Sequence, residues 1–296
     1  MRDDELEQLS QLDARGFLLR PGETSEEFAG RRARIEEWNR DFDRKLAKGK
    51  VEFAPGLFAD ERLRIPQEIY GEAADVTDRW YGFRLDWAPG FYLNERLGFL
   101  WGGCAWSDDR TGESLLIVRK AFRNRAKWFV YGRTELLAHE LCHTAHQTVE
   151  PDSPLEEFFA YRTGESRLRR YLGNCFLREV DALLFMLPSL LLLAAQLLVV
   201  LGGVDLPIWP FWCLAAAGPG WLLLRNAFWR RRYFRAKKAL EDAGAVRADA
   251  VLFRMTSREM TEIGGMCPDK VKDWIDRRDD PRFAVIRRRF ITEVKE

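Results

Sequence analysis

Two long apolar stretches place the strongest constraint on how this chain of 296 residues folds. The first runs from Ala182 to Val204 and the second from Leu206 to Leu224, and neither contains a charged residue. A helix needs about 20 apolar residues to cross the hydrocarbon core of a bilayer. Asp205 alone connects the two stretches, so the pattern predicts a transmembrane helical hairpin over residues 181–225. The alternative is a pair of buried helices in a soluble core.

Basic residues on both sides of the hairpin predict its orientation. Those before it are Arg162, Arg167, Arg169, Arg170 and Arg178, and those after it are Arg225, Arg230, Arg231, Arg232, Arg235, Lys237 and Lys238. The connecting turn has no lysine or arginine. The positive-inside rule therefore predicts a multi-pass protein of the cytoplasmic membrane with both termini in the cytoplasm. The basic run after Leu224 is read as a topology signal, with contact to anionic head groups as a second interpretation.

The rest of the composition excludes several partners and compartments. Lysine and arginine number 47 and aspartate and glutamate 46, so the net charge of +1 provides no argument for a nucleic-acid partner. The five cysteines contain no CxxC pair, which favours a reducing compartment over a disulfide framework. The N-terminus is acidic and polar, unlike a signal peptide. The lipid bilayer is thus the one partner that composition predicts.

Outside the hairpin, the chain divides into three parts. Residues 1–50 are predicted to form a helical, solvent-exposed segment, with a helix starting at Thr24 because cap residues precede carboxylates there. Residues 51–180 are rich in aromatic residues and glycine and are predicted to hold a small sheet flanked by helices. Residues 226–296 are predicted to form a cytoplasmic helical tail, with a helix starting at Thr256.

Five segments within residues 51–180 have readable secondary structure. The predicted strands are Phe91–Leu93, Phe99–Trp101 and Ser114–Arg119, and the predicted helices are Glu135–His146 and Leu155–Leu172. The strand over Ser114–Val118 is also considered as a sheet edge that holds an extended peptide by backbone pairing.

The segment His139-Glu140-Leu141-Cys142-His143 carries the chemistry. Two histidines four residues apart project from one face of a helix, so both imidazoles can bind one metal ion. The intervening Glu140 is then placed to act as general base for a water that the metal activates. His146 lies seven residues beyond His139, about 10 Å along the helix axis, which is too far to share that ion. It is interpreted as a surface residue or one that supports a ligand.

A hydrolytic zinc site uses three protein ligands, and the next helix supplies carboxylates for the third. Glu157 is the preferred ligand and Glu156 is its rival. The other of the two glutamates is expected to be a solvated first-turn carboxylate. Tyr161, Tyr131 and Arg162 are candidates for stabilising the transition state. Of these, Tyr161 is predicted to act beside Glu140.

With these motifs, the chain resembles the gluzincins, peptidases with H-E-x-x-H and a downstream glutamate. Glu157-Phe158-Phe159-Ala160-Tyr161 is similar to the E-x-x-A-D string of the membrane metallopeptidases that include the heat-shock and CAAX-prenyl proteases. The resemblance implies that His139, His143 and Glu157 bind Zn²⁺ and that Glu140 is the base. It implies an α+β fold with a zincin-like domain over residues 51–180, and a zinc metallopeptidase, more an endopeptidase than an exopeptidase, acting on peptides or proteins.

Two departures limit the resemblance to the class. Tyr161 replaces the aspartate of that string, and here the hairpin follows the third ligand, whereas in those proteases a hairpin separates the two motifs. Two alternatives also stay open. One is a deformylase-like hydrolase with Cys104, in Gly103-Cys104-Ala105, as third ligand. The other is an inactive membrane scaffold with a structural or vestigial metal site. Glu140→Gln discriminates, because a scaffold has no need of a base.

Overall fold

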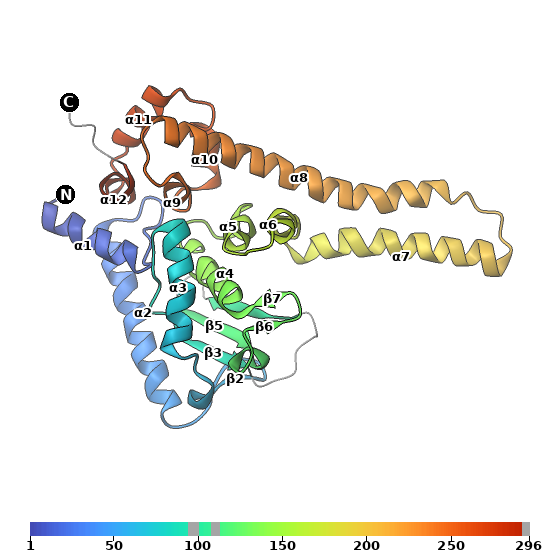
Figure 1. Ribbon diagram of the computed structural model, residues 1–296, viewed down its shortest axis with the longest axis horizontal. Coiled ribbons are helices and arrows are strands. Elements are labelled where there is room, and N and C mark those ends of the chain that lie inside the picture. Colours follow the sequence, from blue (N-terminus) through green and yellow to red (C-terminus); the bar gives the residue numbers. More distant parts are fainter. Residues whose placement is uncertain (94–100, 108–112, 292–296) are drawn as a thin grey trace.

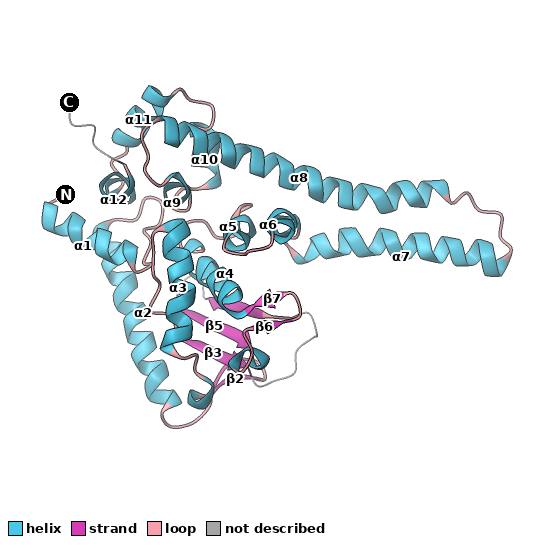
Figure 2. Ribbon diagram, in the orientation of Figure 1, coloured by secondary structure: helices cyan, strands magenta, loops and turns pink. Residues whose placement is uncertain are grey.

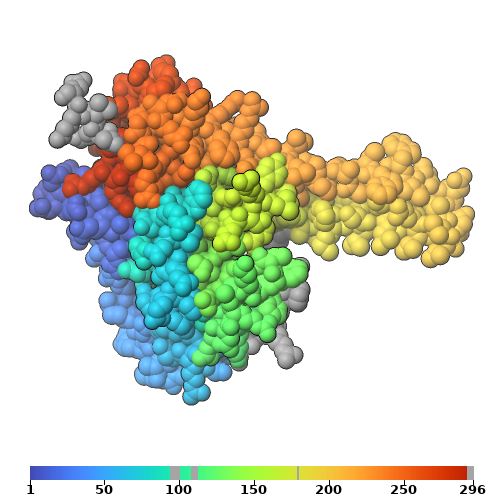
Figure 3. Space-filling view, in the orientation of Figure 1, coloured from blue at the N-terminus to red at the C-terminus, as the bar shows by residue number. Residues whose placement is uncertain are grey.

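The computed structural model describes residues 1–93, 101–107 and 113–291 (Figure 1). It combines helices with short strands, which confirms the predicted α+β class (Figure 2). A compact body contains the sheet, and two long helices project from it (Figure 3). The zincin-like identity of the fold stays a prediction.

Two helices begin the chain, α1 (Asp3–Ala14) and α2 (Ser25–Leu46). A capping box confirms the predicted start: Thr24 Oγ1 accepts from the backbone N–H of Glu27 at 3.2 Å, and the Glu27 carboxylate accepts from the backbone N–H of Thr24 at 2.9 Å. The prediction that this segment is solvent-exposed holds only in part. One face of α2 buries apolar residues, among them Phe28 and Ile35, because the helix covers the body.

The main sheet has three strands in the order β3-β5-β4, formed by β3 (Gly90–Leu93), β5 (Ser114–Arg119) and β4 (Gly103–Ser107). The predicted strands at β3 and β5 are confirmed, and the strand expected at Phe99–Trp101 falls largely outside the described residues. β5 is central and not an edge, because it pairs parallel with β3 and antiparallel with β4. Its residues 114–118 are all buried, as a central strand requires. β4 is therefore the edge strand on this side of the described sheet.

Smaller elements complete the sheet region. They are the strands β1 (Val51–Ala54), β2 (Leu57–Ala59), β6 (Lys127–Trp128) and β7 (Tyr131–Gly132), and the 3₁₀ turns η1 (Glu61–Leu63), η2 (Lys120–Arg123) and η3 (Gly173–Cys175). Helices α3 (Gln67–Tyr81) and α4 (Arg133–His146) pack against each other, and α4 lies against β4 and β5. Buried Leu137 and Leu141 anchor α4 to the core, which leaves its opposite face for the site.

The single helix expected over Leu155–Leu172 is two helices, α5 (Glu156–Arg162) and α6 (Arg167–Leu172). Ser166 caps α6 by accepting from the backbone N–H of Arg169. Gly164 lies in the break, where a β-carbon would stand 2.2 Å from a carboxylate oxygen of Glu135. Glu135 also accepts from the backbone N–H of Glu165 at 3.0 Å. A tertiary contact thus stabilises the break.

The two projecting helices are α7 (Glu179–Gly202) and α8 (Trp209–Asp242), which lie side by side (Figure 1). Gly218 permits this approach, because a β-carbon there would stand 2.3 Å from the Leu184 carbonyl oxygen. At their base, Arg225 forms an ion pair with Asp181 at 2.7 Å. We call residues 180–224 of the two helices and their connection the helical arm.

Within the described residues, one helical segment is long and apolar enough to cross a membrane. It is Val180–Gly202, with a mean hydropathy of 2.5 and only 11% of its most apolar window buried. This supports the first predicted span. The second does not meet the same criterion: the uncharged part of α8, Trp209–Leu224, covers about 24 Å. A multi-pass topology therefore stays a prediction.

The tail folds back onto the body through α9 (Ala248–Leu252), α10 (Ser257–Ile263), α11 (Pro268–Asp276) and α12 (Pro281–Phe290). The predicted start at Thr256 is confirmed by a second capping box with Glu259. The tail and the body share one core, in which the rings of Tyr81 and Phe253 stack at 4.2 Å. Buried Arg254 also reaches the Asp13 carboxylate of α1 at 2.8 Å.

Candidate metal centre

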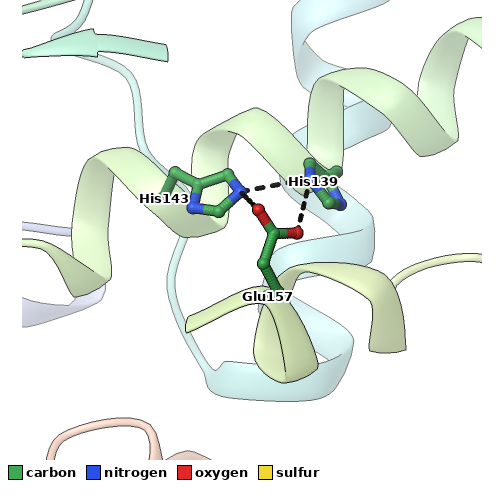
Figure 4. Close-up of side chains that lie close together, drawn as sticks. All are labelled: His139, His143 and Glu157. Atoms are coloured by element: carbon green, nitrogen blue, oxygen red, sulfur yellow. Dashed lines mark hydrogen bonds and ion pairs between the residues drawn. The ribbon is translucent and has the colours of Figure 1, made fainter. Parts of the chain in front are cut away.

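Three predicted ligands meet between α4 and α5 (Figure 4). His139 and His143 project from one face of α4, and Glu157 lies in the first turn of α5. One ligand atom from each lies within 4.8 Å of the others. The two Nε2 atoms are 3.1 Å apart, and each lies 3.6 Å from a carboxylate oxygen of Glu157. Glu157, and not its rival Glu156, completes this group.

The spacing of the two imidazole nitrogens fits one tetrahedral ion. Ligands at 2.0–2.1 Å from a tetrahedral zinc stand about 3.3 Å apart. The two Nε2 atoms, 3.1 Å apart, are close to that value, and Glu157 faces each of them with a different carboxylate oxygen at 3.6 Å. Two imidazole nitrogens that face each other this closely also need a hydrogen or a metal ion between them, because two bare lone pairs repel. The residues present therefore fit a metal.

Other groups hold both imidazoles in place. His143 Nδ1 lies 2.8 Å from the Glu156 carboxylate, so Glu156 orients the His143 ring and is not the solvated surface charge that was predicted for one of the two glutamates. A ring N–H of His139 donates to the backbone carbonyl of Ala160, while its Nε2 faces the cluster. Such contacts select the tautomer whose Nε2 can bind a metal.

Burial and charge shift the pKa values of these groups in opposite directions. Burial lowers the pKa of His139 well below its usual range, and the neighbouring His143 adds to the effect. For His143, burial opposes the charge, but the hydrogen bond to Glu156 and the charge of Glu157 prevail and raise its pKa to about 9. Burial raises the pKa of Glu157. The pocket thus collects negative charge around one position where a cation would be stabilised.

Glu140 lies beside the cluster with only 5% of its surface exposed. Burial raises its pKa to about 7, and the backbone N–H of Ala105 on β4 donates to its carboxylate. Gly103 allows β4 to lie close to its neighbour β5, since a β-carbon there would stand 2.7 Å from the Ile117 carbonyl oxygen of β5. A buried carboxyl group with a pKa near neutrality is suited to proton transfer.

Of the three candidates for stabilising the transition state, the two tyrosines lie at the site and the arginine does not. The Tyr161 ring packs edge-on against the His139 ring at 4.6 Å. Gly173 lies so close to the Tyr161 ring that a β-carbon at residue 173 would clash with it. Tyr161 and Tyr131 line a second cavity of about 200 Å³ that also reaches His139 and Glu140. Arg162 points away and pairs with Asp249 at 3.0 Å, so its proposed place at the site was wrong. Neither burial nor pairing partners can be read from a string of residue types.

His146 is a core residue, and the prediction of a surface or ligand-supporting position was wrong. It is fully buried and packs against the rings of Phe159 at 4.8 Å and Phe253 at 5.1 Å. Neither ring nitrogen has a hydrogen-bond partner within the described residues. Burial lowers its pKa to about 4, so the ring is neutral. The apolar tail residue Phe253, which sequence reasoning did not place here, explains this burial.

An open cleft of about 690 Å³ leads from the ligands to the base of the helical arm. Its walls include Cys104 and Ala105 of β4 at one end and Leu177, Arg225 and Trp229 at the other. Sequence reasoning missed this second group, because only folding brings it beside the histidines. The Cys104 thiol is not in the described ligand group, and burial raises its pKa to about 11. This geometry provides no support for the deformylase-like alternative.

The chain was compared with models of protein families, with curated proteins and with solved structures, and none of them matches. The geometry of the site is therefore the basis for proposing a function.

Proposed function

We propose that this protein is a membrane-anchored, zinc-dependent metallopeptidase. The observation that carries the proposal is the convergence of His139, His143 and Glu157 beside the buried carboxyl group of Glu140. Three ligands leave one coordination position open, which is typical of catalytic and not of structural zinc sites. A structural site also has no need of a neighbouring base.

The donor set of two imidazoles and one carboxylate is the basis for proposing zinc. When bound, the ion would supply Lewis acidity and a nucleophile near neutral pH. The chain would contribute the remaining work. Glu156 and the Ala160 carbonyl would hold the two imidazoles, and Tyr161 would press on the His139 ring.

Glu140 would move the proton. Its carboxylate would accept a proton from the attacking water and deliver it to the nitrogen of the leaving amine. A pKa near 7 suits both transfers at neutral pH, because the group gains and loses a proton at similar cost. The N–H of Ala105 would keep the carboxylate in place between the two transfers.

The substrate would lie along β4. This edge strand lines the cleft with Cys104 and Ala105, so an extended peptide can pair with its backbone. The peptide-binding edge predicted at Ser114–Val118 is thus assigned to β4, because Ser114–Val118 belong to the central strand β5. The cleft is open and continues past the ligands, so it can accept chain on both sides of the cleaved bond. That favours an endopeptidase.

The helical arm would anchor the enzyme in a bilayer. Helix α7 meets the length and composition of a span, and α8 would return to the same side although its uncharged part is short. The basic residues at the base of both helices favour a cytoplasmic location for the body and both termini.

The test is metal content and peptide hydrolysis by the detergent-purified full chain. We expect one zinc per chain in the wild type and in Glu140→Gln, and little or none in Glu157→Ala. Hydrolysis of a mixed peptide library should be present in the wild type and absent in both variants. Glu165→Gln is the matched control, because Glu165 is exposed and outside the ligand group. No zinc uptake, or hydrolysis unchanged in Glu140→Gln, would refute the proposal, and zinc with no hydrolysis in the wild type would indicate a scaffold.

A further inference from the structure

Another cavity, of about 260 Å³, lies where α3, α5, α6 and α8 meet. Four arginines line it: Arg162, Arg167, Arg170 and Arg230. Aromatic rings, among them Trp80 and Tyr171, form the rest of the wall. None of its lining residues belongs to the metal cleft. We call it the arginine pocket.

The positive charge of the arginine pocket is poorly compensated. No carboxylate lines it. Arg162 pairs with Asp249 behind the wall, but Asp249 also pairs with Lys237 at 2.6 Å. Across residues 1–93, 101–107 and 113–291, no ion pair is found for Arg167, Arg170 or Arg230. The site therefore has at least two positive charges in excess.

The aromatic rings hold these guanidinium groups in place. The Arg230 guanidinium carbon lies 4.9 Å from the centre of the Tyr171 ring, and that of Arg162 lies 4.7 Å from the Trp80 ring. Arg230 also donates to the Arg170 carbonyl at 3.3 Å. Burial lowers the pKa of Arg230, and the charge of Arg162 acts in the same direction. Stacked guanidinium groups offer planar pairs of donors, which is the geometry that binds phosphate oxygens.

The pocket lies close to the proposed membrane surface. Arg230 follows Leu224, the last residue of the apolar part of α8, by six residues, or about 9 Å along the helix. The polar head-group layer is about 5–7 Å thick on each side of the hydrocarbon core. Arg167 and Arg170 lie on α6, the last α-helix before α7. The long side chains can bridge the small remaining distance.

We propose that the arginine pocket binds a phosphate group, carried by the head group of an anionic lipid or free in solution. A cavity smaller than the usual 300–1,000 Å³ of a drug-sized site suits such a small, charged group. Bound phosphate would compensate the arginines and tie α6 to α8 at the base of the helical arm. This inference does not depend on the peptidase function.

The test uses the detergent-purified full chain and three separate probes: inorganic phosphate, phosphatidylglycerol and phosphatidylcholine. Binding is followed by the midpoint of thermal unfolding and by lipid retained in native mass spectrometry. We expect Arg230→Gln and Arg167→Gln to weaken binding about tenfold, since each removes hydrogen bonds to a charged group. Arg231→Gln is the control, because it removes the same charge from an exposed neighbour outside the pocket.

The outcomes separate the sources of the phosphate. Retention of phosphatidylglycerol over phosphatidylcholine, with little effect of inorganic phosphate, would assign the site to a lipid head group. Stabilisation by inorganic phosphate without lipid retention would assign it to a free phosphate. Arg167 is exposed, so Arg167→Gln should fold and still tests phosphate binding even if Arg230→Gln fails to fold. Binding of neither anionic probe, or equal losses in Arg231→Gln and the pocket variants, would overturn the proposal.

Discussion

The body and the helical arm differ in where they place charged and apolar side chains. The body encloses charged groups in pairs, such as Arg31 with Glu23 at 2.8 Å and Arg254 with Asp13 at 2.8 Å. The arm has no buried charge between residues 182 and 224 and instead exposes apolar side chains, with Leu190 at 55% and Leu201 at 78%. Exposed apolar surface on this scale is rare in soluble monomers and marks a protein–protein or membrane contact. This difference is the basis for proposing that the arm lies in a bilayer and the body in water.

Breaking a buried pair in the body should have the largest effect. Asp13→Ala leaves Arg254, 1% exposed, without its carboxylate, and also removes a partner of Arg289. We expect a loss of about 3–5 kcal/mol in the free energy of unfolding, measured by chemical denaturation in detergent. A loss below about 1 kcal/mol would mean that the body tolerates unpaired charge and would weaken the comparison.

Introducing a charge into the arm should have the next largest effect. Leu191→Arg places a guanidinium at the middle of α7, at a cost of about 2.5–3.5 kcal/mol for insertion into a bilayer. We expect less protein to remain with membranes after alkaline extraction. Val246→Arg, at an exposed apolar position of the body, is the control and should behave as the wild type. Equal membrane retention of the two variants would contradict a bilayer location for the arm.

The candidate metal centre lies in the body, and it too is built from polar groups that are mostly buried and paired. Glu156→Gln keeps the shape of the side chain but removes the charge that faces His143 Nδ1. We expect zinc affinity to fall about 10- to 100-fold, as measured by competition with a chelator. Glu165→Gln should leave it unchanged. An unchanged affinity in Glu156→Gln would show that Glu156 does not orient the ligand.

An exposed ion pair of the body should have the smallest effect. Arg15 and Asp86 are 3.1 Å apart with about half of each side chain exposed. We expect Asp86→Asn to change the free energy of unfolding by about 1 kcal/mol or less, under the same denaturation conditions as Asp13→Ala. A loss as large as that of Asp13→Ala would show that burial is not what distinguishes the two pairs.

Local patterns in the sequence determined several features of this protein. The capping boxes at Thr24 and Thr256, the apolar helix α7 and the shared face of His139 and His143 all follow from residues within a few positions of one another. Backbone geometry alone relates such residues, so periodicity predicts them.

Only the tertiary structure decided the features that join distant segments. Adjacent residues on a helix point about 100° apart, so the crossing of α5 over α4 placed Glu157 beside both imidazole Nε2 atoms and turned Glu156 onto His143 Nδ1. In the same way, pairing made β5 central, and Phe253 of the tail buried His146. The arginine pocket unites α3, α5, α6 and α8, which no short pattern connects. The physical reason is that these contacts depend on how whole elements pack, and packing is set by the complete core and not by local spacing.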